Sequence, residues 1–195
     1  MKIKSLSAIA AALILSSGSA VWAADYAVDA AHTTVSFKIR HLFSKVQGEF
    51  KVFEGSFSYD PADLSQWKVE ARADAASIDT NVEKRDNHLR SKDFFDTANY
   101  PEVTFKSTGA RDQEGDTAKL DGLLTIHGVE KPVTFDVEVH GEGNDPWGNT
   151  RLGLTATARI NRKDFGLTWN ETLETGQLLV GEEVDITLEV EGIKK

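Results

Sequence analysis

Residues 133–140 read VTFDVEVH and alternate apolar with polar or acidic side chains at a strict period of two. Residues 183–190, EVDITLEV, repeat the same alternation. Successive side chains of a β-strand point to opposite faces, so each stretch has one face suited to a core and one suited to water. The pattern therefore predicts strands of a sheet that buries one face.

Six further stretches carry comparable alternation, with turn-forming residues between them. The gaps are mostly short, which favours antiparallel neighbours, because parallel strands need long crossover connections. We therefore predict an all-β fold, an eight-stranded antiparallel lipocalin-like barrel. The predicted strands centre on residues 35–39, 46–52, 67–73, 103–107, 120–126, 133–139, 152–160 and 184–190.

The long connection between residues 77 and 100 is predicted to hold one short helix. Thr80 followed three residues later by Glu83 has the spacing of a capping box. Asp86 and Arg90 have the spacing of an i,i+4 ion pair on a helix surface. Both features favour a helix in this Ser77–Tyr100 connection.

The first 23 residues have the pattern of a secretory signal peptide. Lys2 and Lys4 precede an uncharged apolar stretch over residues 8–15, and small residues follow up to Ala23. The apolar stretch is shorter than the roughly 20 residues of a membrane-spanning helix, so we expect cleavage rather than anchoring. We predict that residues 1–23 are removed and that residues 24–195 form a single domain.

The chain is acidic and contains no cysteine. Its formal charge is −9, and removal of Lys2 and Lys4 with the signal peptide takes it to −11. Such a charge disfavours nucleic acid and anionic membrane surfaces as partners. The lack of cysteine excludes disulfides, thiol nucleophiles and thiolate metal sites. We therefore expect no nucleic-acid partner.

A barrel of eight strands can turn its apolar side toward lipid or toward its own interior. In a transmembrane barrel the charged strand faces, such as Glu70 with Arg72, would crowd an interior just wide enough for side chains. We therefore predict a barrel with its apolar face inside and no stable membrane insertion.

Six inward positions hold small residues, which leaves two interpretations open. Small residues can leave room for one small ligand, as in lipocalins. They can equally interdigitate with large aromatic side chains in a solid core. The six are Gly48, Ala71, Ala73, Gly122, Ala156 and Ala158.

Short motifs are spread along most of the mature chain. They are RDNHLRS at 85–91, DFFD at 93–96, YP at 100–101, VTF at 103–105, GLLTIHGV at 122–129, KPV at 131–133, DPWG at 145–148, DFGL at 164–167 and VGEEV at 180–184. Together they resemble the motifs of the YceI family of bacterial periplasmic proteins. The resemblance implies an extended lipocalin-like barrel whose tunnel holds a long isoprenoid or related lipid. It also implies location in the periplasm of a Gram-negative bacterium and homodimers among the members. No catalytic role follows from the resemblance.

Motifs for common catalytic or metal chemistry are not found in the sequence. It has no Gly-x-Ser-x-Gly elbow, no phosphate loop and no pair of histidines at metal-ligand spacing. We therefore expect a protein that is not an enzyme. We expect no metal and no cofactor, other than a bound isoprenoid lipid or quinone.

The predicted ligand site is the apolar interior of the barrel with a polar group at its mouth. Arg85, His88 and Arg90 could surround a lipid head group, since guanidinium pairs bidentately with phosphate. The alternative is that they only satisfy the ends of the helix. The predicted apolar pocket residues are Val35, Phe37, Ile39, Phe50, Ala71, Phe105, Leu124, Phe135, Val137, Trp147, Leu154, Ala156, Phe165 and Trp169.

The leading functional hypothesis is a periplasmic binding or carrier protein for an apolar isoprenoid lipid. Burial of the lipid chain supplies the binding free energy without special chemistry. Two alternatives remain open. The first is an enzyme acting on a prenyl lipid, with Asp86, His88 or Asp93 as acid or base. The second is a solid structural barrel that acts through protein contacts.

Overall fold

The computed structural model describes residues 23–174 and 176–195. The predicted signal peptide, residues 1–23, lies outside the described residues apart from Ala23. The described chain forms strands β1 Ala24–Val28, β2 Thr34–His41, β3 Ser44–Phe50, β4 Phe53–Tyr59, β5 Lys68–Asp74, β6 Ile78–Asp79, β7 Glu102–Glu114, β8 Thr117–Ile126, β9 Val129–Asn144, β10 Thr150–Asn161 and β11 Val180–Lys194, with helix α1 Glu83–Arg90 and the 3₁₀ turns η1 Leu64–Gln66, η2 Ala75–Ser77 and η3 Arg162–Phe165.

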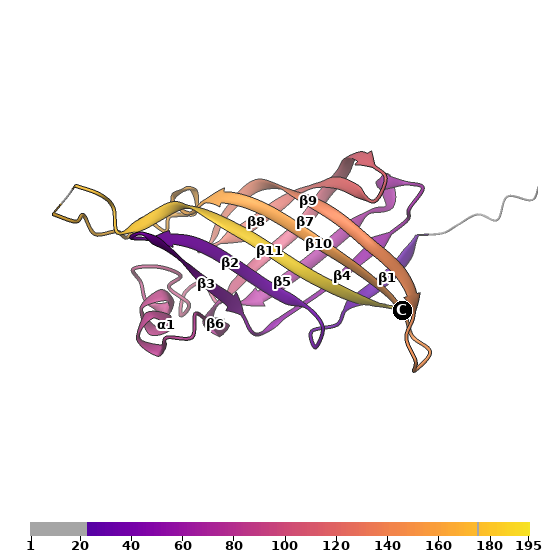
Figure 1. The fold of residues 1–195 in the computed structure, drawn as a ribbon, viewed down its shortest axis with the longest axis horizontal. Coiled ribbons are helices and arrows are strands. Elements are labelled where there is room, and N and C mark those ends of the chain that lie inside the picture. Colours follow the sequence, from indigo (N-terminus) through magenta and orange to yellow (C-terminus); the bar gives the residue numbers. More distant parts are fainter. Residues whose placement is uncertain (1–22, 175) are drawn as a thin grey trace, which may run out of the picture.

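The strands close into a ring of eight antiparallel neighbours (Figure 1). The order is β1-β4-β5-β7-β8-β9-β10-β11, and β1 pairs back onto β11. The remaining three strands extend members of this ring beyond bends in the chain: β2 extends β1, β3 extends β4, and β6 extends β5. Strand β11 therefore pairs with β2 over residues 180–189 and with β1 over residues 192–194. The predicted eight-stranded antiparallel barrel is confirmed, and each predicted strand centre falls on an observed strand.

One predicted strand, residues 46–52, crosses a bend that the sequence pattern did not reveal. β3 ends at Phe50 and β4 begins at Phe53, because residues 51–52 turn aside to bond with η2. The Lys51 N–H donates to the Ser77 carbonyl (3.2 Å), and the Val52 N–H donates to Ser77 Oγ (3.0 Å). Val52 is consequently exposed rather than buried.

Aromatic residues close the end of the barrel that carries the C-terminus. Tyr26 of β1 is fully buried and stacks on Phe57 of β4, with ring centroids 5.0 Å apart. Its hydroxyl donates to Glu142 (2.8 Å), and burial together with this carboxylate raises the pKa of Tyr26. On the neighbouring wall Tyr59 packs on Trp67, whose indole N–H donates to the Asp60 carbonyl (2.8 Å). This end is therefore plugged by rings, and the polar atoms of Tyr26 and Trp67 are hydrogen-bonded.

The opposite end of the barrel carries α1, the β2–β3 turn and the loop between η3 and β11 (Figure 1). The Leu42 N–H of the turn donates to the Leu179 carbonyl of the loop (2.9 Å), and Arg40 donates to the carbonyls of Leu42 and Leu178. We call this the helix end of the barrel. No helix among the described residues is long and apolar enough to cross a membrane.

The start of α1 differs from the predicted capping box. Val82 is the N-cap residue, and it makes no side-chain cap. Thr80 instead donates its hydroxyl to the buried carboxylate of Asp86, while Arg85 Nε donates to the same hydroxyl (2.7 Å). The predicted Asp86–Arg90 ion pair does not form either, because Arg90 donates to the backbone. A buried carboxylate needs local donors, and Thr80 supplies them.

Replacing Thr80 by Val is expected to lower the free energy of unfolding by about 2 kcal/mol. The substitution removes one hydrogen bond from the Asp86 carboxylate and one from the Arg85 guanidinium, and both groups are charged. Urea denaturation measures the change. Thr157→Val is the matched control, since Thr157 is exposed on β10. An equal effect of the two substitutions would contradict the assignment of Thr80 to a buried network.

Candidate functional site

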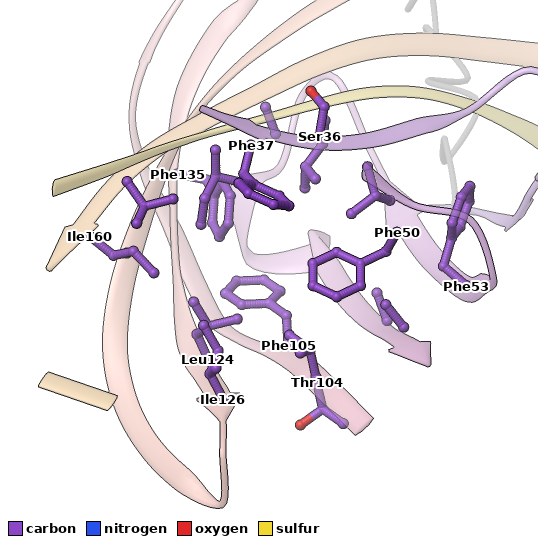
Figure 2. A pocket seen from close by; sticks show the side chains of 18 of the residues that line it. Ser36, Phe37, Phe50, Phe53, Thr104, Phe105, Leu124, Ile126, Phe135 and Ile160 are labelled. Carbon is purple, nitrogen blue, oxygen red and sulfur yellow. The ribbon is translucent and has the colours of Figure 1, made fainter. Parts of the chain in front are cut away.

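The barrel encloses a cavity of about 380 Å³ that runs between the helix end and the plugged end. Figure 2 shows the rings of Phe37, Phe50, Phe105 and Phe135 directed toward this common space from different strands. Aliphatic and aromatic side chains make up nearly all of the wall. The cavity has the apolar character of sites that bind lipids or other water-insoluble molecules.

Twelve of the fourteen predicted pocket residues line this cavity. They come from strands on all sides of the barrel and from the loop between η3 and β11. Strand parity therefore predicted the inward direction of the eleven that lie on strands. The twelve are Val35, Phe37, Ile39, Phe50, Ala71, Phe105, Leu124, Phe135, Val137, Leu154, Ala156 and Trp169.

The other two predicted pocket residues lie elsewhere. Trp147 sits in the turn between β9 and β10 with 80% of its surface exposed, so it is not part of the cavity. Phe165 is fully buried, but it packs outside the cavity against a cluster that includes Leu124 and Ile126. Both residues belong to connections, where the alternation of a strand gives no information about direction.

The small inward residues divide between the two open interpretations. A Cβ atom at Gly48 would lie 2.4 Å from Phe37 Cζ, and one at Gly122 would lie 2.3 Å from Phe105 Cζ. Rings fill the space at both glycines. Ala71 and Ala156, by contrast, line the cavity. The barrel is therefore hollow, with a packed layer where glycine meets phenylalanine.

Three rings gather at the helix end of the cavity. His88 of α1 lies edge-on to Trp169 (centroids 4.8 Å apart) and to Phe94 (5.0 Å), and Phe94 lies 5.1 Å from Trp169. All three residues line the cavity. His88 Nε2 is hydrogen-bonded to the Asp93 carboxylate (2.9 Å), which fixes the orientation of its ring. The predicted role of Trp169 at the pocket is consistent with this position.

The predicted head-group residues have different positions. Arg85 and His88 line the cavity, whereas Arg90 does not. Arg90 donates to the carbonyls of Ala76 (2.6 Å) and Ile78 (2.8 Å), which anchors α1 to the wall of the barrel. Arg90 therefore has a structural position, although its backbone acceptors lie in η2 and β6 and not at the ends of the helix, as the alternative interpretation had it.

Arg162 is a polar cavity residue that the sequence analysis did not predict. It is 3% exposed and lines the cavity directly after the end of β10. The missed signal is parity, because Arg162 continues the inward series of Leu154, Ala156 and Ile160. A charged residue at an inward position usually has a specific role.

Among the described residues, one group could hold a metal ion by proximity, namely Asp29, His32 and Glu191. It lies at the plugged end and none of the three lines the cavity. Arg151 binds Asp29 (2.6 Å) and Glu191, so a cation already occupies the centre of the group. The arrangement fits an ion-pair cluster better than a metal centre.

The whole domain matches known proteins. A YceI-like domain model matches residues 26–192. Protein YceI of Escherichia coli O157:H7 is 42% identical over 188 residues, which cover 95% of this chain and 94% of that protein. The crystal structure of BcnA from Burkholderia cenocepacia superposes with a TM-score of 0.75 at 28% identity, covering 84% of this chain and 98% of that one.

A more distant structure shares the fold. It is a polyisoprenoid binding domain from Saccharophagus degradans, with a TM-score of 0.64 at 16% identity, covering 87% of this chain and 98% of that one. The family-model match and the identity to the Escherichia coli protein both extend over nearly the whole domain. The chain therefore belongs to the YceI-like domain family.

Proposed function

We propose that this protein binds one apolar isoprenoid lipid, a polyprenyl or quinone-like molecule, inside the barrel and carries it through the periplasm. The observation that carries the proposal is the apolar cavity of about 380 Å³ inside a closed barrel. The polyisoprenoid binding domain of Saccharophagus degradans, which has the same fold, supports the choice of ligand class. The signal-like residues 1–23 support the location.

The lipid tail alone supplies enough binding free energy. Burial yields roughly 0.8 kcal/mol per CH₂ group, or about 4 kcal/mol per isoprene unit of five carbons. About four buried units would give micromolar affinity after the cost of association. The rings of Phe37, Phe50, Phe105 and Phe135 offer such a tail a continuous apolar surface.

A carrier is favoured over an enzyme by the state of the candidate acid and base groups. Asp86 accepts two hydrogen bonds from Thr80, and neither Asp86 nor Asp93 lines the cavity. His88 does line it, but its Nε2 atom is engaged by Asp93. General acid–base chemistry needs a free group within hydrogen-bond reach of the reacting atom. Of the three candidate groups only His88 reaches the cavity, and Asp93 holds its ring.

Mass spectrometry of the protein purified from its native periplasm tests the proposal. We expect one prenyl lipid per protein chain in the native spectrum and one prenyl species in an organic extract. The same native spectrum tests the expected homodimer. An empty cavity, or straight-chain lipids only, would contradict the assignment of an isoprenoid ligand. Turnover of a supplied prenyl lipid would favour the enzyme instead.

A further inference from the structure

We propose that Arg162 binds an anionic head group, a phosphate or a carboxylate, of the lipid held in the cavity. The inference rests on the proposed function and specifies the chemistry of the ligand. It also fixes the ligand's direction, because Arg162 lies at the helix end of the barrel and the aromatic plug closes the other end.

One nitrogen of the Arg162 guanidinium has no hydrogen-bond partner among the described residues. The Nε atom donates to the Gly181 carbonyl (2.8 Å), and Nη1 donates to the Leu167 carbonyl. The remaining nitrogen, Nη2, is buried. Buried guanidinium nitrogens are normally bonded, because an unpaired one gives up its hydration without compensation. A ligand oxygen is the missing acceptor.

The charge of Arg162 also has no directly bonded carboxylate among the described residues, and Glu182 acts on it only through space. Its protein partners are two neutral carbonyls, and it forms no ion pair within the described chain. The nearby carboxylate of Glu182 pairs with Lys163. Burial without a carboxylate partner lowers the pKa of Arg162. This lack of a partner is notable in a chain with 31 acidic and 22 basic residues.

The rest of the helix end does not supply the missing anion. Arg85, which also lines the cavity, donates to the hydroxyl and carbonyl of Thr80 and has no direct carboxylate partner in the described part of the chain. His88 is paired with Asp93. The two guanidinium groups on this part of the wall, of Arg85 and Arg162, are donors and cations, which suit an anion better than a neutral carbonyl or alcohol.

A purely structural role explains only part of the arrangement. The bonds of Arg162 to Gly181 and Leu167 hold the chain after η3 against β11. Two donors are sufficient for that task. Burial of the third nitrogen adds a desolvation cost, and this nitrogen makes no hydrogen bond among the described residues. Ligand binding accounts for both.

The test compares three ligands with one tail, namely geranylgeranyl phosphate, geranylgeranoic acid and geranylgeraniol, by titration of the delipidated protein. We expect at least one anion to bind about tenfold or more tightly than the alcohol, because charge-assisted hydrogen bonds are the stronger ones. Preference for the phosphate over the acid, or the reverse, identifies the head group. Arg162→Gln should bring the anions to the affinity of the alcohol while leaving alcohol binding unchanged.

Arg90→Gln is the matched control, because Arg90 lies at the same end, bonds backbone carbonyls and does not line the cavity. It should keep the anion preference. Arg162→Lys, which keeps the charge, should retain part of it and serves if Arg162→Gln fails to fold. Equal binding of all three ligands by the unmodified protein would overturn the inference and leave the proposed function standing. Binding of none would overturn both.

Discussion

Ala156→Trp is expected to abolish retention of the lipid while leaving the melting temperature of the lipid-free protein within about 3 °C of its original value. Ala156 of β10 lines the cavity, so an indole added there extends into space that the ligand would occupy. Ala71 on β5 lines the same cavity from another wall. Ala71→Trp should therefore have the same two effects. Loss of lipid and an unchanged melting temperature both follow from a hollow interior, because added side-chain volume destabilises a packed core but not an empty cavity.

Gly122→Ala is the matched control on the same barrel. A Cβ atom at Gly122 would lie 2.3 Å from Phe105 Cζ and 2.7 Å from the Lys106 carbonyl oxygen, so even one methyl group is overpacked. We expect this substitution to cost about 2 kcal/mol, or roughly 6 °C in melting temperature, although it adds far less volume than tryptophan. Bound lipid after purification and melting after delipidation are measured for each variant.

Either of two results would contradict the assignment of Ala71 and Ala156 to the wall of a cavity. One is full lipid retention by the tryptophan variants. The other is a loss of about 10 °C or more in the lipid-free state, which would place these alanines in a packed core. The contrast with Gly122→Ala separates the two kinds of small inward residue, which the sequence alone could not distinguish.

The alternation of side chains was sufficient to predict the barrel because a strand has one geometric period. Residues 133–140 and 183–190 lie in β9 and β11, with their apolar sets inward. The bend at residues 51–52 was missed because it depends on bonds to Ser77, which is distant in the sequence. Periodicity describes a local chain direction and carries no information on such tertiary contacts.

The site was predictable to the extent that strands build it. Parity identified cavity residues such as Phe105 and Leu154, and its consistent use would have found Arg162. It could not orient Trp147 or Phe165, which lie in connections. The Thr80 capping box failed for another reason. The Thr80 hydroxyl instead donates to the buried carboxylate of Asp86. A hydrogen bond to a buried charge stabilises the fold more than a helix cap does.

Arg151→Met is expected to lower the melting temperature at pH 7 by about 10 °C. Arg151 lies at the seam that closes the barrel, where β1 and β11 share only three residue pairs. It binds Asp29 (2.6 Å), Asp145 (2.7 Å) and Glu191, which come from three different segments. Its removal leaves three carboxylates that repel one another beside the weakest pairing of the ring.

The control is Arg159→Met, on the same strand. Arg159 also pairs with a carboxylate, that of Asp185 (2.6 Å), but its side chain is 66% exposed and Asp185 keeps a second partner in Lys45. Exposed pairs contribute little to stability, so we expect a change below about 2 °C. A similar loss in both variants would mean that the Arg151 cluster has no special role at the seam.

The pH dependence of the melting temperature distinguishes the contribution of charge from that of packing in the cluster of Arg151 with its three carboxylates. Arg151 and His32 hold the pKa of Asp29 at about 2, below that of an unfolded chain. The stability from this depressed pKa is present above about pH 4 and is lost as the pH falls toward 2. In Arg151→Met the unpaired carboxylates repel, so their protonation between pH 7 and pH 4 should relieve the folded state. The difference in melting temperature between the unmodified protein and Arg151→Met should therefore become smaller from pH 7 to pH 3. A difference that does not change with pH would mean that the loss of stability comes from packing alone.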